Sequence, residues 1–158
     1  MSSINEEHAS LIGRVQVSFF LSALELDPEL ISQMTRLNPD KKAKRGDERK
    51  NYKGEVITPH QEGFWMISSE GKVESKDIND HIGYLLALLL PHRSTFSDIV
   101  RQMKAETFFD VLWTSNYLYA GTGPIISHES LQGMSDLGAS IGFDIYQEEV
   151  EVRGSSTV

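Results

Sequence analysis

The feature that most constrains this fold is an apolar run at residues 75–90 with the periodicity of one helix face. Ser75 is placed to cap such a helix, and Pro91 is placed to end it. The run is too short to span a bilayer, so we expect no membrane partner. A wide apolar face needs other elements packed against it, and the run therefore predicts the central helix of a globular core. Its apolar positions are Ile78, Ile82, Leu85, Leu86, Leu89 and Leu90.

Four further stretches have the patterns of β-strands. In the first, Val15, Val17, Phe19 and Leu21 alternate with other residues, which is typical of a strand with one buried face. The later runs are rich in aromatic and β-branched residues, which favours strands as well. The predicted strands are residues 14–22, 64–67, 108–114 and 142–152.

Three shorter helices are predicted between these strands. Asp27 is placed to cap the first, and Thr95 with Asp98 has the spacing of a capping box for the second. Ser127 or His128 opens the last one. Residues 40–63 are charged and rich in glycine and proline, so we expect a surface loop there with a short edge strand at residues 55–58. The predicted helices are residues 28–37, 95–103 and 128–137.

This order of elements predicts an α+β fold, a mainly antiparallel sheet with helices packed on one face. The other face is expected to show polar residues such as Gln16, Ser18 and Ser22. The chain of 158 residues most simply forms a single domain. We expect that domain at residues 14–152, between a flexible N-terminus at residues 1–13 and a flexible tail at residues 153–158.

The chain contains no cysteine, which excludes disulfides, zinc–thiolate sites and thiol catalysis. No positively charged and apolar signal segment is visible at the N-terminus. Both observations fit a cytoplasmic protein, which is our expectation for its location.

The net charge of −8 is unevenly distributed. Residues 41–50 carry a local charge of +4, so the remainder carries −12. The basic segment predicts either a solvated loop or a site for phosphate, RNA or an acidic partner. No aromatic residue is interleaved with these basic residues, since the first one is Tyr52, after the segment. Because the acidic remainder also repels nucleic acid, we expect no nucleic-acid partner.

Several short motifs, in this order and spacing, resemble a bacterial family known only as a domain of unknown function. They are the strand 15–21, Leu26-Asp27-Pro28, the loop Lys44-Arg45-Gly46-Asp47, Trp65, the helix 78–90 and the closing Phe143-Asp144-Ile145-Tyr146. The resemblance covers roughly residues 14–146 and implies the family's Lys-Gly-Asp loop, Trp-containing strand and closing Asp-Ile-Tyr strand. Its small acidic members are similar in type to the immunity proteins encoded beside bacterial contact-dependent toxins.

No catalytic, cofactor-binding or metal-binding motif is recognisable. The sequence lacks a G-x-S-x-G elbow, a P-loop and a dinucleotide fingerprint, and its five histidines have no ligand spacing. We therefore predict no catalytic residue, no cofactor, no metal site and no enzyme activity. Asp110 and Asp144 stay open as an acid/base pair across neighbouring strands or as solvated carboxylates. His81 is expected to be partly exposed and paired with Asp77, one helical turn away.

These observations predict a protein that binds another macromolecule, namely a basic protein. The sharper hypothesis is an immunity protein that neutralises a cognate bacterial toxin, for example a nuclease, because an acidic inhibitor complements a basic surface. The alternative is a small-ligand binder or a hydrolase-type enzyme with a pocket between the sheet and the helices. The oligomeric state stays open at this point. The predicted partner-binding residues are Asp110, Asp144, Tyr146, Glu148 and Glu149.

Overall fold

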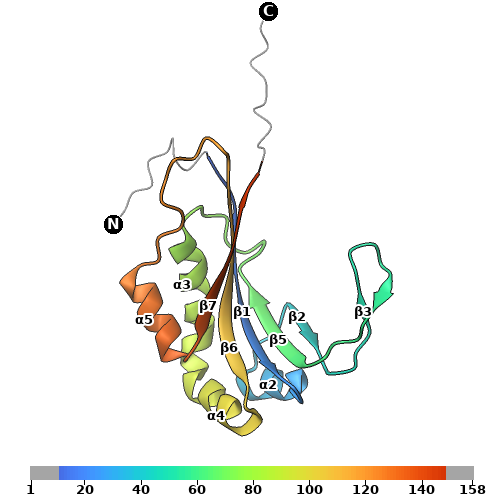
Figure 1. Cartoon of the computed structure of the whole chain (residues 1–158). Helices are drawn as coiled ribbons and strands as arrows, with labels where there is room; N and C mark the ends of the chain where they lie inside the picture. The colour runs from blue at the N-terminus through green and yellow to red at the C-terminus, as the bar shows by residue number, and fades with distance from the viewer. Residues whose placement is uncertain (1–10, 149–158) are drawn as a thin grey trace, which may run out of the picture.

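The computed structural model describes residues 11–148 and shows a five-stranded sheet with helices packed on one of its faces (Figure 1). Its strands are β1 (Ile12–Ala23), β2 (Lys41–Ala43), β5 (Gly63–Ser68), β6 (Glu106–Ser115) and β7 (Ser140–Gln147). They lie in the order β2-β5-β1-β6-β7, and all neighbours are antiparallel except β6 and β7. The predicted α+β fold, a single domain with a mainly antiparallel sheet, is confirmed. The expectations for residues 1–10 and 153–158 lie outside the described residues.

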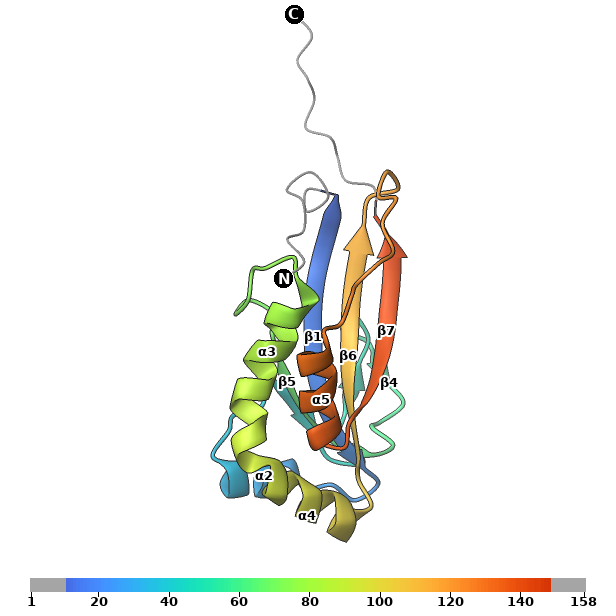
Figure 2. The ribbon, with the colours of Figure 1, turned by 90° about the vertical axis from the view of Figure 1, so that its left-hand side faces the viewer.

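The helices all lie on one side of this sheet, and a small hairpin projects from the other side. Figure 2 shows α3 and α5 in front of the sheet, with α2 and α4 below them. Within residues 11–148 no helix is long and apolar enough to cross a membrane. The helices are α2 (Pro28–Thr35), α3 (Ile78–Leu89), the 3-10 helix η1 (Leu90–His92), α4 (Arg93–Met103) and α5 (His128–Asp136), and the hairpin strands are β3 (Arg49–Lys50) and β4 (Val56–Ile57).

The centre of the core is β1, which has a neighbouring strand on each side and helices over one face. Val17, Phe19 and Leu21 on that face have an exposed fraction of 0 %, as the alternation predicts. The Phe19 ring packs edge-on against Phe96 of α4, with centroids 5.6 Å apart, and 5.3 Å from Phe109 of β6. Burial stabilises the fold by about 1.5–3 kcal/mol for each such side chain.

The helix α3 buries the apolar face that its sequence predicts. Its cap is Asp77, not Ser75 as expected. The Asp77 carboxylate accepts a hydrogen bond from the backbone N–H of Asn79 at 2.9 Å. Ser75 supports this cap, because its hydroxyl accepts a hydrogen bond from the backbone N–H of Asp77 at 3.0 Å. The helix therefore begins within three residues of the expected start, with a carboxylate at the positive end of its dipole.

His81 is buried, with an exposed fraction of 1 %, and the expected exposed pairing with Asp77 is wrong. Its Nε2 donates to the Ser75 carbonyl at 2.6 Å, since a carbonyl oxygen only accepts, and its Nδ1 lies 2.7 Å from the Ser69 hydroxyl. The same hydroxyl accepts a hydrogen bond from the backbone N–H of Val17 at 2.9 Å. His81 therefore links the start of α3 to the sheet.

Two helix boundaries differ from the prediction. The helix α2 ends at Thr35 because Arg36 takes a left-handed conformation, with φ of 58°, and stops the helical hydrogen bonding there. Thr95 is not a cap, because α4 begins earlier, at Arg93. Pro91 ends α3, but it lies in η1, which leads directly into α4. The chain thus turns between two packed helices without a loop.

Residues 40–63 are more ordered than a surface loop. Here β2 pairs with β5 at the edge of the sheet, and β3 pairs with β4 as a separate hairpin. The expected short strand near residues 55–58 is present as β4, but it belongs to the hairpin. The base of the hairpin is held by two backbone hydrogen bonds, from Gly46 to the His60 carbonyl at 2.8 Å and from His60 to the Asp47 carbonyl at 3.1 Å.

The last strand, β7, is parallel to β6 because α5 carries the chain back between them, as a parallel connection requires. Ser127 caps α5, as predicted, by accepting a hydrogen bond from the backbone N–H of Ser130 at 3.1 Å. The strand runs from Ser140 to Gln147, so it starts two residues before the predicted position. Residues 149–152 of the predicted strand lie outside the described part of the chain.

Candidate functional site

Four of the five predicted partner-binding residues lie on the sheet face without helices, with Asp110 on β6, Asp144 and Tyr146 on β7, and Glu148 directly after β7. Alternate residues of a strand share a face, which places Asp144, Tyr146 and Glu148 in one row. Asp110 of β6 lies on the same face and pairs with Gly142 of β7, two residues before Asp144. Glu149 lies outside the described residues. The sequence therefore identified most of one continuous row of polar side chains.

Asp110 and Asp144 form a local centre of negative charge. Burial raises the pKa of Asp110 above its ordinary value of 3.8, and the negative charge of Asp144 raises it further. Neither carboxylate has an ion-pair partner among residues 11–148. Two neighbouring carboxylates without a cation attract a basic group from outside the chain.

Glu148 has a different role, because it already has partners within the chain. Its carboxylate is held by Arg14 at 2.5 Å and accepts a hydrogen bond from the Thr114 hydroxyl at 2.9 Å. The hydrogen bond from Arg14, and then the one from Thr114, lower the pKa of Glu148 below its ordinary value. Glu148 therefore offers a partner protein less uncompensated charge than Asp144 does.

Sequence reasoning missed the apolar residues on the opposite face of β7. Phe143 and Ile145 lie beside Val111 and Trp113 of β6, which are buried, yet they are 44 % and 54 % exposed. Tyr146, on the other face, is also 54 % exposed. The sequence signal for Phe143 and Ile145 is the same alternation that marks a buried strand, so no pattern distinguishes them as exposed.

The two edges of the sheet differ in how they meet solvent. The strand β2 has three residues, and its Lys41 and Lys42 are exposed, which discourages pairing with another chain. The other edge, β7, has eight residues and one neighbouring strand within residues 11–148. A long edge with exposed apolar side chains is a template for pairing with a further strand. The row along β7 is therefore our candidate functional site.

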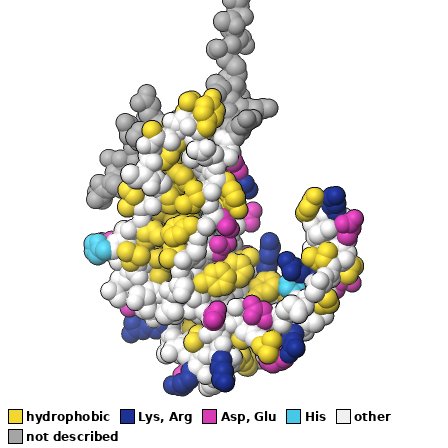
Figure 3. Space-filling model, viewed as in Figure 1, with side chains coloured by type: hydrophobic (Ala, Val, Ile, Leu, Met, Phe, Trp, Pro, Cys, Tyr) yellow, Lys and Arg dark blue, Asp and Glu magenta, His cyan; other side chains and the backbone are white. Residues whose placement is uncertain are grey.

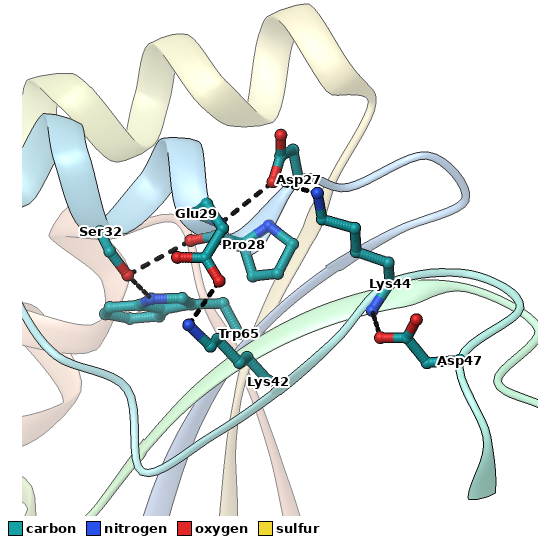
Figure 4. A network of polar contacts seen from close by, with 8 residues as sticks. All are labelled: Asp27, Pro28, Glu29, Ser32, Lys42, Lys44, Asp47 and Trp65. Atoms are coloured by element: carbon teal, nitrogen blue, oxygen red, sulfur yellow. Dashed lines mark hydrogen bonds and ion pairs between the residues drawn. The ribbon is translucent and has the colours of Figure 1, made fainter.

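The basic segment at residues 41–50 folds against acidic residues that precede it in the chain (Figure 4). The ion pairs are Lys42–Glu29, Lys44–Asp27 and Arg45–Glu25, at 2.5, 3.2 and 2.5 Å. The hydrogen bond from Lys44 is the largest cause that lowers the pKa of Asp27. Beneath this network, the Trp65 indole N–H donates to the Ser32 hydroxyl at 3.1 Å. Much of the local positive charge is thus compensated by α2 and the turn before it.

The sheet face without helices is not uniformly polar. Gln16, Ser18 and Ser22 lie on it as expected, but so do Phe20 and the aromatic side chains beside it. A pocket of about 330 Å³ lies there, between the sheet and the hairpin. The expected ligand pocket was between the sheet and the helices, and this pocket lies on the other side. Within residues 11–148 no group of three or more His, Asp or Glu side chains is arranged to hold a metal ion.

One family model matches residues 13–148, and its description is a domain of unknown function (DUF4279). That range includes nearly all of the described residues and both elements of the candidate site. The description names no reaction, substrate or partner, and no enzyme family is indicated. No curated protein and no solved structure matches the chain.

Proposed function

We propose that this chain, which belongs to the DUF4279 family of domains of unknown function, is a binding module that captures a basic protein along β7. The observation that carries the proposal is the edge of β7, which has a single neighbouring strand within residues 11–148. That edge presents exposed Phe143 and Ile145 on one face, and Asp144 beside Asp110 on the other. Backbone, apolar and acidic groups are thus available along the same eight residues.

The mode of binding is strand addition. A strand of the partner supplies backbone hydrogen bonds to β7, and its alternate side chains meet the two faces separately. Its apolar residues cover Phe143 and Ile145, while its Lys or Arg residues meet Asp110 and Asp144. Apolar and aromatic contacts such as those of Tyr146 carry most of the affinity, and the charge pairs raise the association rate.

The sharper form of the proposal is an immunity protein that neutralises a cognate bacterial toxin, with a nuclease as the leading case. Its support is the net charge of −8 together with the likeness in type to small acidic immunity proteins. An acidic inhibitor complements the surface with which a nuclease binds phosphates. The enzyme alternative has less support, because neither Asp110 nor Asp144 lines the pocket on that face.

The binding proposal is tested with the tagged full chain as bait in an extract of the organism that encodes it. The edge variant replaces both Phe143 and Ile145 with Ser. Its control is Val56→Ser, which removes an even more exposed apolar side chain (64 %) from the hairpin. We expect the wild type and the control to retain the same basic protein and the edge variant to lose it. Equal recovery by the edge variant, or no recovered protein at all, contradicts the proposal.

The charge and toxin parts are then tested separately. Asp144→Asn is expected to slow association with the recovered partner by up to about tenfold at low salt and less at high salt, with little change in thermal stability. For the immunity form, the partner gene should be toxic when expressed alone and harmless together with the wild-type chain. If the partner binds but is not toxic, the immunity form is wrong and the binding module stands.

A further inference from the structure

The pocket beneath the hairpin has the size of a small-molecule site. Its volume is about 330 Å³, within the range of pockets that hold small ligands. Figure 3 shows the hollow between the sheet and the hairpin, with hydrophobic, basic and histidine side chains gathered at it. None of its residues belongs to β7. The lining residues are Phe20, Ser22, Arg49, His60, Gln61, Glu62, Phe64 and Phe108.

The floor of the pocket is built from aromatic rings. Phe20 of β1 and Phe108 of β6 face one another across the ladder, and their rings stack with centroids 4.9 Å apart and planes 2° apart. Phe64 of β5 extends the surface, with its centroid 6.2 Å from that of Phe20. Because three adjacent strands supply one ring each, the register of the sheet holds the floor in place. Such a surface suits a ligand that carries an aromatic ring.

The wall of the pocket comes from the hairpin and the residues after it. The His60 ring lies 5.4 Å from that of Phe64, so it closes one side of the aromatic floor. The two backbone hydrogen bonds that join His60 to Gly46 and Asp47 fix this wall before any ligand binds. Arg49 lines the same pocket and has no ion-pair partner among residues 11–148. Its guanidinium is therefore available to an anionic group, for which its planar fork is well suited.

The charges of the pocket decide which anion fits. Glu62 also lines the pocket. Without counting His60, the charges of Arg49 and Glu62 cancel, so the pocket has a net charge near zero. A ligand with a single negative charge gains the contact with Arg49, whereas the second charge of a phosphate is repelled by Glu62. We propose that this pocket binds a small aromatic carboxylate, with its ring on Phe20 and Phe108 and its carboxylate on Arg49. This site is independent of partner binding along β7.

The test is a titration of the ¹⁵N-labelled full chain with phenylacetate, followed by NMR. The comparison probes are benzyl alcohol, which lacks the charge, acetate, which lacks the ring, and phenyl phosphate, which adds a charge. We expect saturable shifts at the backbone amides of Arg49, His60 and Phe64, with phenylacetate binding at least about tenfold more tightly than the three comparison probes.

Two variants locate the contacts. Arg49→Gln should weaken phenylacetate roughly tenfold and leave benzyl alcohol unchanged, because it removes one charge-assisted hydrogen bond. Its control is Arg93→Gln, at an exposed arginine of α4, which should change neither. Phe108→Leu keeps an apolar side chain but removes the stacked ring, and should weaken both aromatic probes.

Three results would overturn the proposal. The first is a titration with no saturation up to about 10 mM, a range in which binding is too weak to indicate a built site. The second is a set of shifts at residues away from the pocket, or an Arg49→Gln variant that binds phenylacetate as the wild type does. The third is tighter binding of phenyl phosphate than of phenylacetate, which would show that the pocket does not prefer a carboxylate.

Discussion

The strands β1 and β7 have the same apolar alternation but different surroundings. In β1 the alternate residues Val17, Phe19 and Leu21 are fully buried, whereas in β7 Phe143 and Ile145 are about half exposed. The first strand has β5 and β6 beside it and α3 over it; the second has β6 alone within residues 11–148. The comparison shows that alternation reports which residues share a face and does not report whether anything covers that face.

The difference also has an energetic consequence. Burial of apolar area stabilises a protein by about 25 cal/mol for each Å² removed from water. The apolar residues of β1 are buried within the chain, so their apolar area already stabilises the fold. Much of the apolar area of Phe143 and Ile145 has not, and it remains available for a bound partner. A partner that binds at the edge strand β7 therefore buries more apolar area than one that binds over β1.

Truncation of one phenylalanine in each strand is expected to have the largest effects on stability. Phe19→Ala should lower the free energy of unfolding by about 3–5 kcal/mol, because its ring is enclosed by Phe96 and Phe109. Phe143→Ala should lower it by less than about 1 kcal/mol, since 44 % of the residue is exposed. Urea unfolding of both variants measures the losses. Similar losses would mean that Phe143 is covered in solution, for example by a second copy of the chain.

Two glycines, one in β5 and one in β7, differ in the space around them. In β5, a Cβ added to Gly63 would lie 2.5 Å from the Leu26 carbonyl oxygen, so Gly63→Ala should cost about 1–3 kcal/mol. In β7, a Cβ added to Gly142 meets nothing within 4 Å. Gly142→Ala should therefore be neutral or stabilise the fold by up to about 1 kcal/mol, since alanine restricts the unfolded chain. Thermal unfolding of both variants measures these effects. A loss of stability in Gly142→Ala would show that Gly142 is closely packed in solution.

The smallest effects concern charge at the open edge. The raised pKa of Asp110 favours its protonated form in the folded state, so stability falls as pH rises from near 3.8 through the raised value. Asp110→Asn should remove that fall and make the protein slightly more stable at neutral pH. The lowered pKa of Glu148 has the opposite sign: its stabilisation is present above 4.5 and is lost as pH falls through the lowered value.

Glu148→Gln should therefore reduce stability at neutral pH and weaken the loss in acid. Both effects should be smaller than those of the glycine variants, because the two side chains are partly exposed and their interactions are screened. Urea unfolding from about pH 3 to about pH 7 measures them together. Shifts of the same sign for Asp110→Asn and Glu148→Gln would contradict the assigned causes of the two pKa changes.

Features that depend on neighbouring residues were predictable. The caps Asp27 and Ser127 bond to amides two or three residues later, so a short window of sequence contains both partners. The apolar face of α3 and the alternation of β1 follow from residue spacing in the same way. The row of Asp144, Tyr146 and Glu148, along β7 and directly after it, was also predicted, because alternate residues of an extended chain share a face.

Features built from distant parts of the chain were not predictable. The sequence alone does not show that the charge of the basic segment is compensated, because its partners Glu25, Asp27 and Glu29 precede it by many residues and approach it only in the fold. The aromatic floor of the pocket joins three strands that are far apart in the sequence. The burial of His81 is not predictable from the sequence, because its partner Ser69 lies outside its own helix.

Local patterns dictated the types of the main helices and strands, which of their residues share a face, and the row of Asp144, Tyr146 and Glu148, because each depends on interactions within a few residues. Tertiary structure decided which apolar strand is enclosed and which is left at the edge. That choice depends on where the helices pack and on the parallel return of the chain through α5. Whether a strand is covered depends on which elements pack beside it, and for β7 the whole fold determines those elements.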